Sequence, residues 1–180
     1  MLCPRRALAA LLLLASLATA ASAKVHHAKS EALEFAFPGA DRVESKTFFL
    51  TDEEKSRIED LGKAPLESKL VVVHVGDKDG APMGYAFIDS QVVRTLPETM
   101  LIVVSPEGSV AKLLLLAFNE PPEYEAPERW LEQFPGRTLG PELRVERDIH
   151  GIAGSTLTAH AVTTAVRRSL ALFQVLIQKK

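Results

Sequence analysis

Four apolar runs of strand length fill the middle of the chain, and each is rich in Val, Ile, Leu and aromatic residues. The runs are residues 69–75, 84–93, 99–104 and 110–118. Short turn segments separate them and leave no room for crossover helices, so we expect successive strands to pair antiparallel as hairpins. The unbroken leucines of residues 113–116 suggest a central strand covered on both faces, although periodicity alone does not separate such a strand from a buried helical turn.

Two helices are predicted beside these strands. Thr51 or Asp52 can cap a helix that runs to about Leu61 and ends at Gly62. Residues 156–177 carry apolar residues at steps of three and four, which predicts a long amphipathic helix. Its apolar stripe consists of Val162, Val166, Leu170, Phe173 and Ile177, and we expect the first four to pack on the sheet.

Weaker patterns complete the outline. A short helix is predicted over residues 126–134 and a further strand over 143–148, while residues 24–34 are a leader or the start of a short helix. The whole pattern predicts an α+β fold, with a largely antiparallel sheet, flanking helices and a long C-terminal amphipathic helix. We divide the chain into a signal peptide at 1–23, a leader segment at 24–45 and one domain at 46–180.

The first 23 residues have the three parts of a secretory signal peptide. Arg5 and Arg6 precede an apolar run over 7–17, and small residues lead to a cleavage site after Ala23, with a second choice after Ala20. The apolar run is shorter than the roughly 20 residues that span a bilayer. We therefore expect an exported, periplasmic protein, either soluble or held at the membrane by a partner.

Cleavage would remove Cys3, the one cysteine of the chain, so cysteine chemistry is excluded. It would also leave 19 Lys and Arg residues against 23 Asp and Glu residues, a net charge of −4, with no basic block. This balance argues against nucleic acid as a partner. His26 and His27 are adjacent but have no third ligand nearby, so no metal site is predicted.

The segment before the last helix has the most unusual composition. Gly154, Ser155, Thr156 and Thr158 bring small residues and three hydroxyls to the predicted helix start. The first N–H groups of a helix have no intrahelical partner and, with the helix dipole, form an anion site that suits phosphate. The alternative is ordinary capping, in which Ser155 or Thr156 accepts hydrogen bonds from those N–H groups and nothing binds.

A family resemblance begins at these residues. The run Ala-Gly-Ser-Thr-Leu-Thr-Ala-His-Ala-Val at 153–162 resembles the Ser-Gly-Ala-Thr-x-Thr-x-x-Ala-Val signature of the FMN-binding domain family. That domain occurs in the C subunit of the sodium-translocating NADH:quinone reductase and in the G subunit of Rnf electron-transport complexes. The resemblance implies FMN held covalently through a phosphoester to Thr156, made by a flavin transferase, with Gly154, Ser155, Leu157 and Thr158 around it.

Looser matches extend over about residues 71–162. Gly84-Tyr85-Ala86 resembles the family's glycine-aromatic strand start, residues 118–122 resemble its loop beside the flavin, and 130–136 resemble its following Phe-Gly motif. The resemblance implies a flavin ring directed toward Glu120, with Tyr85 as a further ring contact. The chain departs from the signature at Ala153 and Ser155, and His150 stands where the family has an aspartate that the transferase reads.

We therefore expect an exported, covalently flavinylated electron-transfer module that serves an extracytoplasmic or membrane redox chain. Its partners would be the flavin transferase and redox proteins, including a membrane complex. We expect an electron carrier more than a stand-alone flavoenzyme, because a single short domain leaves little room for a substrate site and no catalytic side chains were found. The alternative is a non-redox binding module in which the Gly-Ser-Thr segment only caps the helix, with His150 and His160 structural.

Overall fold

One six-stranded antiparallel sheet organises the protein, with strand order β1-β6-β5-β4-β3-β2. The computed structural model describes residues 24–25 and 29–179, so the predicted signal peptide and both His26 and His27 lie outside the described residues. The strands are β1 (Lys24–Val25), β2 (Arg42–Phe49), β3 (Leu70–Lys78), β4 (Ala81–Val92), β5 (Pro97–Val104) and β6 (Val110–Phe118). The helices are α2 (Lys29–Ala36), α3 (Asp52–Gly62), α4 (Glu128–Leu131), α5 (Thr156–Leu176) and the short 3₁₀ helix η1 (Pro122–Tyr124).

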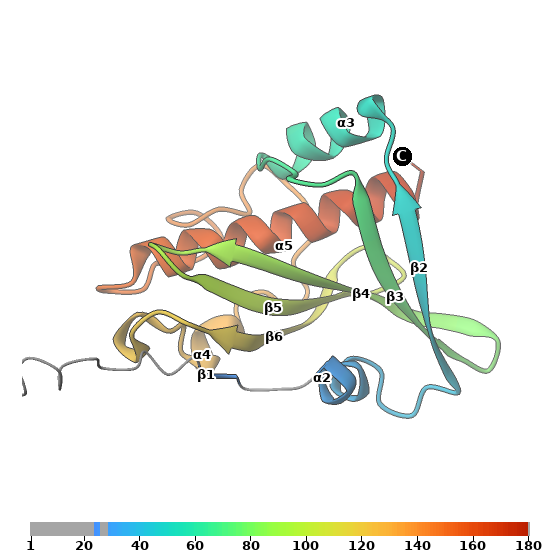
Figure 1. The fold of residues 1–180 in the computed structure, drawn as a ribbon, viewed down its shortest axis with the longest axis horizontal. Coiled ribbons are helices and arrows are strands. Elements are labelled where there is room, and N and C mark those ends of the chain that lie inside the picture. The colour runs from blue at the N-terminus through green and yellow to red at the C-terminus, as the bar shows by residue number, and fades with distance from the viewer. Residues whose placement is uncertain (1–23, 26–28, 180) are drawn as a thin grey trace, which may run out of the picture.

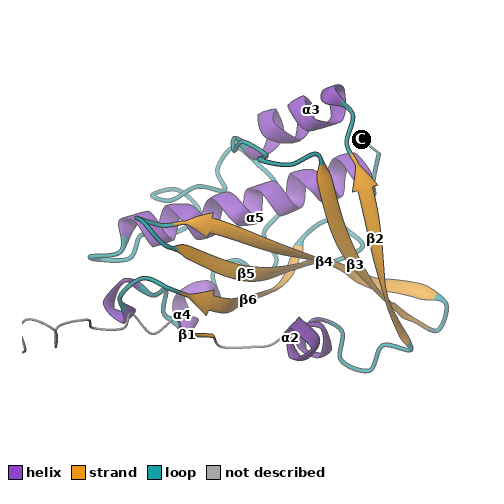
Figure 2. Cartoon of the chain, in the orientation of Figure 1, coloured by secondary structure: helices purple, strands orange, loops and turns teal. Residues whose placement is uncertain are grey.

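The α+β prediction is confirmed. All four predicted strands are present and pair antiparallel in chain order as β3, β4, β5 and β6. Helices α3 and α5 lie on one side of the sheet and α2 lies on the other (Figure 1). Figure 2 shows the same arrangement by element type, with the strands in one layer between the helices. Short hairpin turns, such as Asp79-Gly80 with φ angles of 52° and 78°, make this meander possible.

Helix α5 packs through the predicted stripe. Val162, Val166, Leu170 and Phe173 are each at most 1% exposed and belong to the core cluster between α5 and the sheet. A smaller cluster on the other face joins α2 to the sheet through Leu101, Val103 and Leu116. Because the side chains of a strand alternate between faces, one strand contributes to both clusters.

The leucines of β6 are covered on both faces, as predicted. Leu115 belongs to the core under α5, whereas Leu116 belongs to the cluster under α2. The prediction of a central position was wrong, because beyond β6 lies only β1, which pairs with Ala117 and Phe118.

Two other predictions need correction. Residues 143–148 are not a strand, since Glu146 has a φ of 66° and the segment makes only one isolated bridge, between Val145 and Ile149. Tight backbone bonds, such as Arg147 N–H to the carbonyl of Arg144 (3.2 Å), fold it into turns. The helix predicted over 126–134 is confined to α4. Of the two alternatives for residues 24–34, the start of a short helix is present as α2, whereas β2 is a strand that the apolar runs did not indicate.

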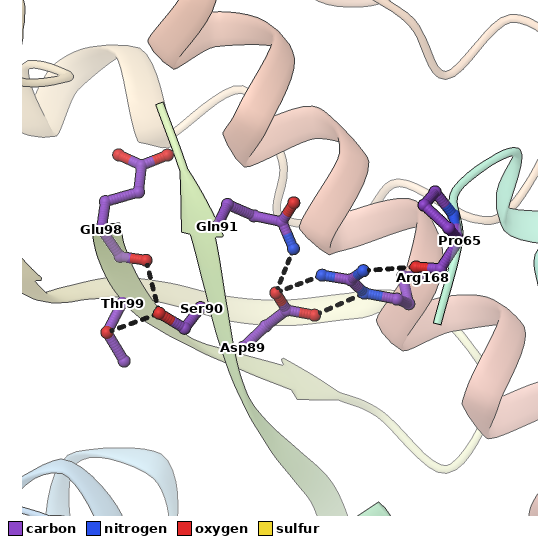
Figure 3. A network of polar contacts seen from close by, with 7 residues as sticks. All are labelled: Pro65, Asp89, Ser90, Gln91, Glu98, Thr99 and Arg168. Atoms are coloured by element: carbon purple, nitrogen blue, oxygen red, sulfur yellow. Dashed lines mark hydrogen bonds and ion pairs between the residues drawn. The ribbon is translucent and has the colours of Figure 1, made fainter. Parts of the chain in front are cut away.

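A buried ion pair fixes α5 over β4. Arg168 donates to both carboxylate oxygens of Asp89 at 2.6 and 2.8 Å and also to the carbonyl of Pro65 (2.8 Å), as Figure 3 shows. Both side chains of the pair are about one-tenth exposed. The guanidinium therefore connects α5 to β4 and to the loop between α3 and β3, and it holds α5 in position over the sheet. Across the described part of the chain, none of the helices has the length and apolarity needed to cross a membrane.

Candidate functional site

The start of α5 follows a sharp turn at Gly154, whose φ of 82° favours glycine. Ser155 occupies the N-cap position, and the first hydrogen bond of the helix runs from Ala159 N–H to the Ser155 carbonyl (3.1 Å). The backbone N–H groups of Thr156, Leu157 and Thr158 have no hydrogen-bond acceptor among the described residues. The helix therefore begins with three free donors.

Side-chain capping does not close this helix start. The Ser155 hydroxyl donates to the carbonyl of Glu123 (3.2 Å) and the Thr158 hydroxyl donates to the carbonyl of Tyr124 (2.6 Å). Both hydroxyls are buried, and both attach the η1 segment to α5. The expected alternative of ordinary capping by Ser155 is thus absent, because that side chain makes no cap hydrogen bond.

Thr156 differs from its two hydroxyl neighbours. Its side chain is exposed, and its hydroxyl has no hydrogen bond to any residue that the structure describes. A free hydroxyl next to three free N–H groups combines a nucleophilic oxygen with an anion-binding backbone. The geometry thus separates Thr156 from Ser155 and Thr158, which the residue types alone could not do.

These residues line one pocket of about 370 Å³. Its walls are Val93, Arg94, Tyr124, Gly154, Ser155, Thr156, Leu157 and Thr158. The five residues predicted from 154 to 158 are therefore brought together, and the volume lies in the range of ordinary ligand sites. Arg94 and Tyr124 complete the pocket from segments far away in the sequence.

Positive charge predominates among the residues that line this pocket. The Arg94 guanidinium lies 4.6 Å from the centre of the Tyr124 ring, a cation–π contact that restrains this exposed side chain. No acidic residue occurs in the first turn of α5, and none is among the residues that line the pocket. The positive end of the helix dipole and the charge of Arg94 therefore act in the same direction.

Glu120 supports this pocket without lining it. Its Oε1 accepts hydrogen bonds from the N–H groups of Arg94, Thr95 and Leu96, at 3.1, 2.6 and 2.8 Å. These backbone donors, that of Thr95 first, lower the pKa of Glu120. An ionised Glu120 thus fixes the turn between β4 and β5 and, with it, the position of Arg94.

Tyr85 is not brought to this pocket. Its ring lies 5.2 Å from that of Phe173. Phe173 follows Thr156 by 17 positions, which is about 25 Å along a helix that rises 1.5 Å per residue. The structure therefore separates Tyr85 from the other predicted site residues by nearly the length of α5.

The region around His150 is organised through its backbone. The indole N–H of Trp130 donates to the His150 carbonyl (2.6 Å), and the His150 N–H donates to the Gln133 side chain (2.8 Å). Asp148, the nearest upstream aspartate, lies 3.7 Å from Arg137. Within the described residues, no group of three or more His, Cys, Asp or Glu side chains is placed to hold a metal.

Comparison with known proteins finds a relative of this chain in a redox complex. No family model matches the chain. Over 117 residues it is 28% identical to the G subunit of the Na⁺-translocating ferredoxin:NAD⁺ oxidoreductase complex of Acetobacterium woodii. The match covers 59% of this chain and 56% of the relative, so the chain spans about half the length of that protein. The similarity agrees with the resemblance to G subunits that residues 153–162 indicated.

Sequence reasoning missed Arg94 and Tyr124. Arg94 lies in a turn between two predicted strands, and a lone basic residue in a hairpin turn is an ordinary surface feature. Tyr124 follows two prolines and carries no periodic signal. Glu120 was the one sequence signal that could have pointed to the turn of Arg94, because a carboxylate after a strand end can bind the N–H groups of a neighbouring turn.

Proposed function

We propose that the pocket at the start of α5 holds FMN and that the protein is an exported electron-transfer module. The uncapped helix start carries this proposal, because its three free N–H groups adjoin the exposed hydroxyl of Thr156. The similarity to the G subunit of a ferredoxin:NAD⁺ oxidoreductase complex supports a redox role. The residues present suit a phosphate group, which is the part of FMN that a helix N-terminus recognises.

Each part of the phosphate site has a residue of this chain. The N–H groups of Thr156, Leu157 and Thr158 would donate to phosphate oxygens, and the Arg94 guanidinium would add a charged donor. Glu120 would hold Arg94 in place through its three backbone contacts. Ser155 and Thr158 would hold η1 against α5, since their hydroxyls already donate hydrogen bonds to carbonyls of η1.

We further propose that Thr156 carries the flavin covalently. A flavin transferase would supply a flavin dinucleotide, the Thr156 oxygen would form a bond to the flavin-side phosphorus, and the bond from that phosphorus to AMP would break. The hydroxyl proton would pass to the transferase or to solvent. Exposure of Thr156 supports this step, because the hydroxyl must reach the transferase.

FMN supplies the uptake and release of electrons through its isoalloxazine ring, while the protein binds and positions it. A covalent tether keeps the flavin from diffusing away, which suits a site outside the cytoplasm. Redox proteins, including a membrane complex, would be the partners of this module. The protein would be soluble or peripheral at the membrane.

The competing function is a non-redox module in which the Gly-Ser-Thr segment is a helix cap. Such a cap requires a side-chain oxygen of Ser155 or Thr156 that accepts from the first turn, and neither side chain does so. The free N–H groups of the first turn therefore support the flavin site over a helix start closed by its own side chains.

Colour and reversible reduction test the proposal. The exported protein, produced together with a flavin transferase, is expected to be yellow, to bleach with a chemical reductant and to recover its absorption in air. Arg94→Gln should weaken FMN binding by the unmodified protein by about 10- to 100-fold, the loss of one charged hydrogen bond. Arg57→Gln, an exposed arginine of α3 outside the pocket, is the matched control and should bind FMN normally. A colourless protein that also fails to bind added FMN would contradict the proposal.

A further inference from the structure

A second pocket, of about 210 Å³, lies beside α5 beyond its first turn. It is lined by Gly62, Lys63, Arg144, Val145, His160, Thr163, Thr164 and Arg167. Helical spacing relates it to the first pocket, since His160 follows Thr156 by four positions and therefore lies on the same side of α5. The lining contains two arginines, a lysine and a histidine but no acidic residue.

Arg167 is the central charge of this pocket and is only 7% exposed. Its guanidinium donates to four carbonyls, those of Leu61, Gly62, Gly140 and Leu143, at 2.7 to 3.0 Å. Two of these carbonyls end α3, so the negative end of that helix dipole compensates part of the charge. Carbonyls are neutral, however, and no carboxylate pairs with Arg167 among the described residues.

Arg144 adds a second positive charge at the exposed rim of the pocket. Arg144 and Arg167 line the same pocket, and burial first and the charge of Arg144 second lower the pKa of Arg167. No ion pair joins the Arg144 side chain to a described carboxylate, whereas Lys63 is paired with Asp60 at 2.6 Å. A buried cation close to a like charge is costly, and a bound anion would relieve that cost.

We propose that this pocket binds a small oxyanion of the phosphate class at Arg144, with the buried charge of Arg167 beside it. The four carbonyl bonds of Arg167 leave one of its five N–H donors for the anion. Thr164 and His160 add a hydroxyl and a ring nitrogen as further donors, whereas the Thr163 hydroxyl is already donated to the carbonyl of Ala159 (2.7 Å). A volume of about 210 Å³ suits a phosphate group better than a whole nucleotide, because sites for larger ligands start at about 300 Å³. This site is separate from the proposed flavin site and does not depend on it.

Thermal unfolding with inorganic phosphate tests the proposal. Phosphate should raise the unfolding midpoint of the wild type more than that of Arg144→Gln, because a bound ligand stabilises the folded state beyond the general salt effect that both proteins share. Arg144→Gln should increase the Kd for phosphate at least tenfold, while Arg57→Gln should leave it unchanged. The Arg144 side chain makes no hydrogen bond to a described residue, so its replacement should not impair folding.

Arg94→Gln distinguishes this site from the start of α5. Phosphate binding that survives Arg94→Gln and is lost in Arg144→Gln assigns the anion to the second pocket. The reverse result, or the absence of any effect specific to phosphate, overturns the proposal. Vesicles that contain phosphatidic acid identify the source of the ligand. If the protein sediments with these vesicles and free phosphate releases it, the ligand is a lipid headgroup. If the protein binds phosphate but does not sediment with the vesicles, the ligand is the free anion.

Discussion

The two longest helices in the described part of the chain begin in opposite ways. At the start of α3, the Thr51 hydroxyl accepts from Glu54 N–H (3.1 Å) and the Glu54 carboxylate accepts from Thr51 N–H (2.9 Å). This reciprocal capping box closes the helix. At the start of α5, the Ser155 hydroxyl instead donates to a carbonyl of η1, and the N–H groups remain open.

The difference follows from how each helix is held. Helix α3 buries only Ile58 and Gly62, so local hydrogen bonds contribute much of its stability. Helix α5 is buried along most of its length and is tied to the sheet by Arg168. Tertiary packing stabilises α5 without a cap, and its N–H groups therefore stay available for a ligand.

The largest expected change in stability comes from removing a side chain that packs α5 against the sheet. Leu170→Ala should lower the free energy of unfolding by about 2–5 kcal/mol, because the side chain is 1% exposed and its loss leaves a cavity. Leu157→Ala removes an equally large side chain from the same helix, at a position that is 53% exposed, and should have little effect. Urea denaturation measures both variants. Equal losses would show that packing does not distinguish the two positions.

The second prediction concerns a buried carboxyl below the open end of α5. Glu98 lies opposite Gln91 in the β4–β5 register. Gln91 precedes by two residues Val93, which lines the pocket at the start of α5. Figure 3 shows its carboxylate directed away from the Asp89–Arg168 pair, and neither oxygen has a hydrogen-bond partner among the described residues. Burial without a partner raises the pKa of Glu98 from 4.5 to about 8.

A raised carboxyl pKa gives a definite pH dependence. The stability associated with neutral Glu98 is fully present below pH 4.5 and is lost as the pH rises through about 8. Between pH 5 and 7 the wild type should lose on the order of 2–3 kcal/mol, at about 1.36 kcal/mol per pH unit. Glu98→Gln should flatten this slope, whereas Glu132→Gln, an exposed carboxyl, should keep it. A slope that persists in Glu98→Gln would contradict the assignment.

The third and smallest effect compares the two helix starts directly. Thr51→Val removes the capping oxygen of α3 and should cost about 1 kcal/mol of unfolding free energy. Thr156→Val makes the same change at the first residue of α5 and should alter stability by less than about 0.5 kcal/mol, because its hydroxyl has no partner among the described residues. Thermal unfolding of the two variants measures the contrast. A larger cost at Thr156 would reveal a structural role for that hydroxyl.

Sequence patterns predicted the elements that bury a continuous run or stripe of apolar residues. The four hairpin strands and α5 each carry a continuous apolar signal, because one face or both faces of each element are covered. The strand β2 lacks such a signal, since it is an edge strand and most of its residues are exposed. Residues 143–148 misled the prediction because their apolar side chains fill the core from turns, where no period is required.

The candidate site shows a similar limit. The residues from Gly154 to Thr158 were predictable because they are contiguous and resemble a signature. The direction of each hydroxyl was not, because Ser155 and Thr158 donate to carbonyls more than 30 residues away. Arg94 was missed for the same reason, since only the folded chain brings its turn to the start of α5. Tyr85 was placed near the flavin by resemblance alone, and its strand carries it toward Phe173 instead.

The central claim is that Thr156 carries FMN, and the site of covalent modification tests it most directly. The protein would be produced together with a flavin transferase, denatured, separated from free flavin, examined for flavin fluorescence and fragmented to locate the added mass. We predict that wild type and Ser155→Ala keep fluorescence after denaturation, that Thr156→Val loses it, and that the mass of FMN lies on Thr156. Fluorescence that persists in Thr156→Val, or an added mass on Ser155 or Thr158, would contradict the claim.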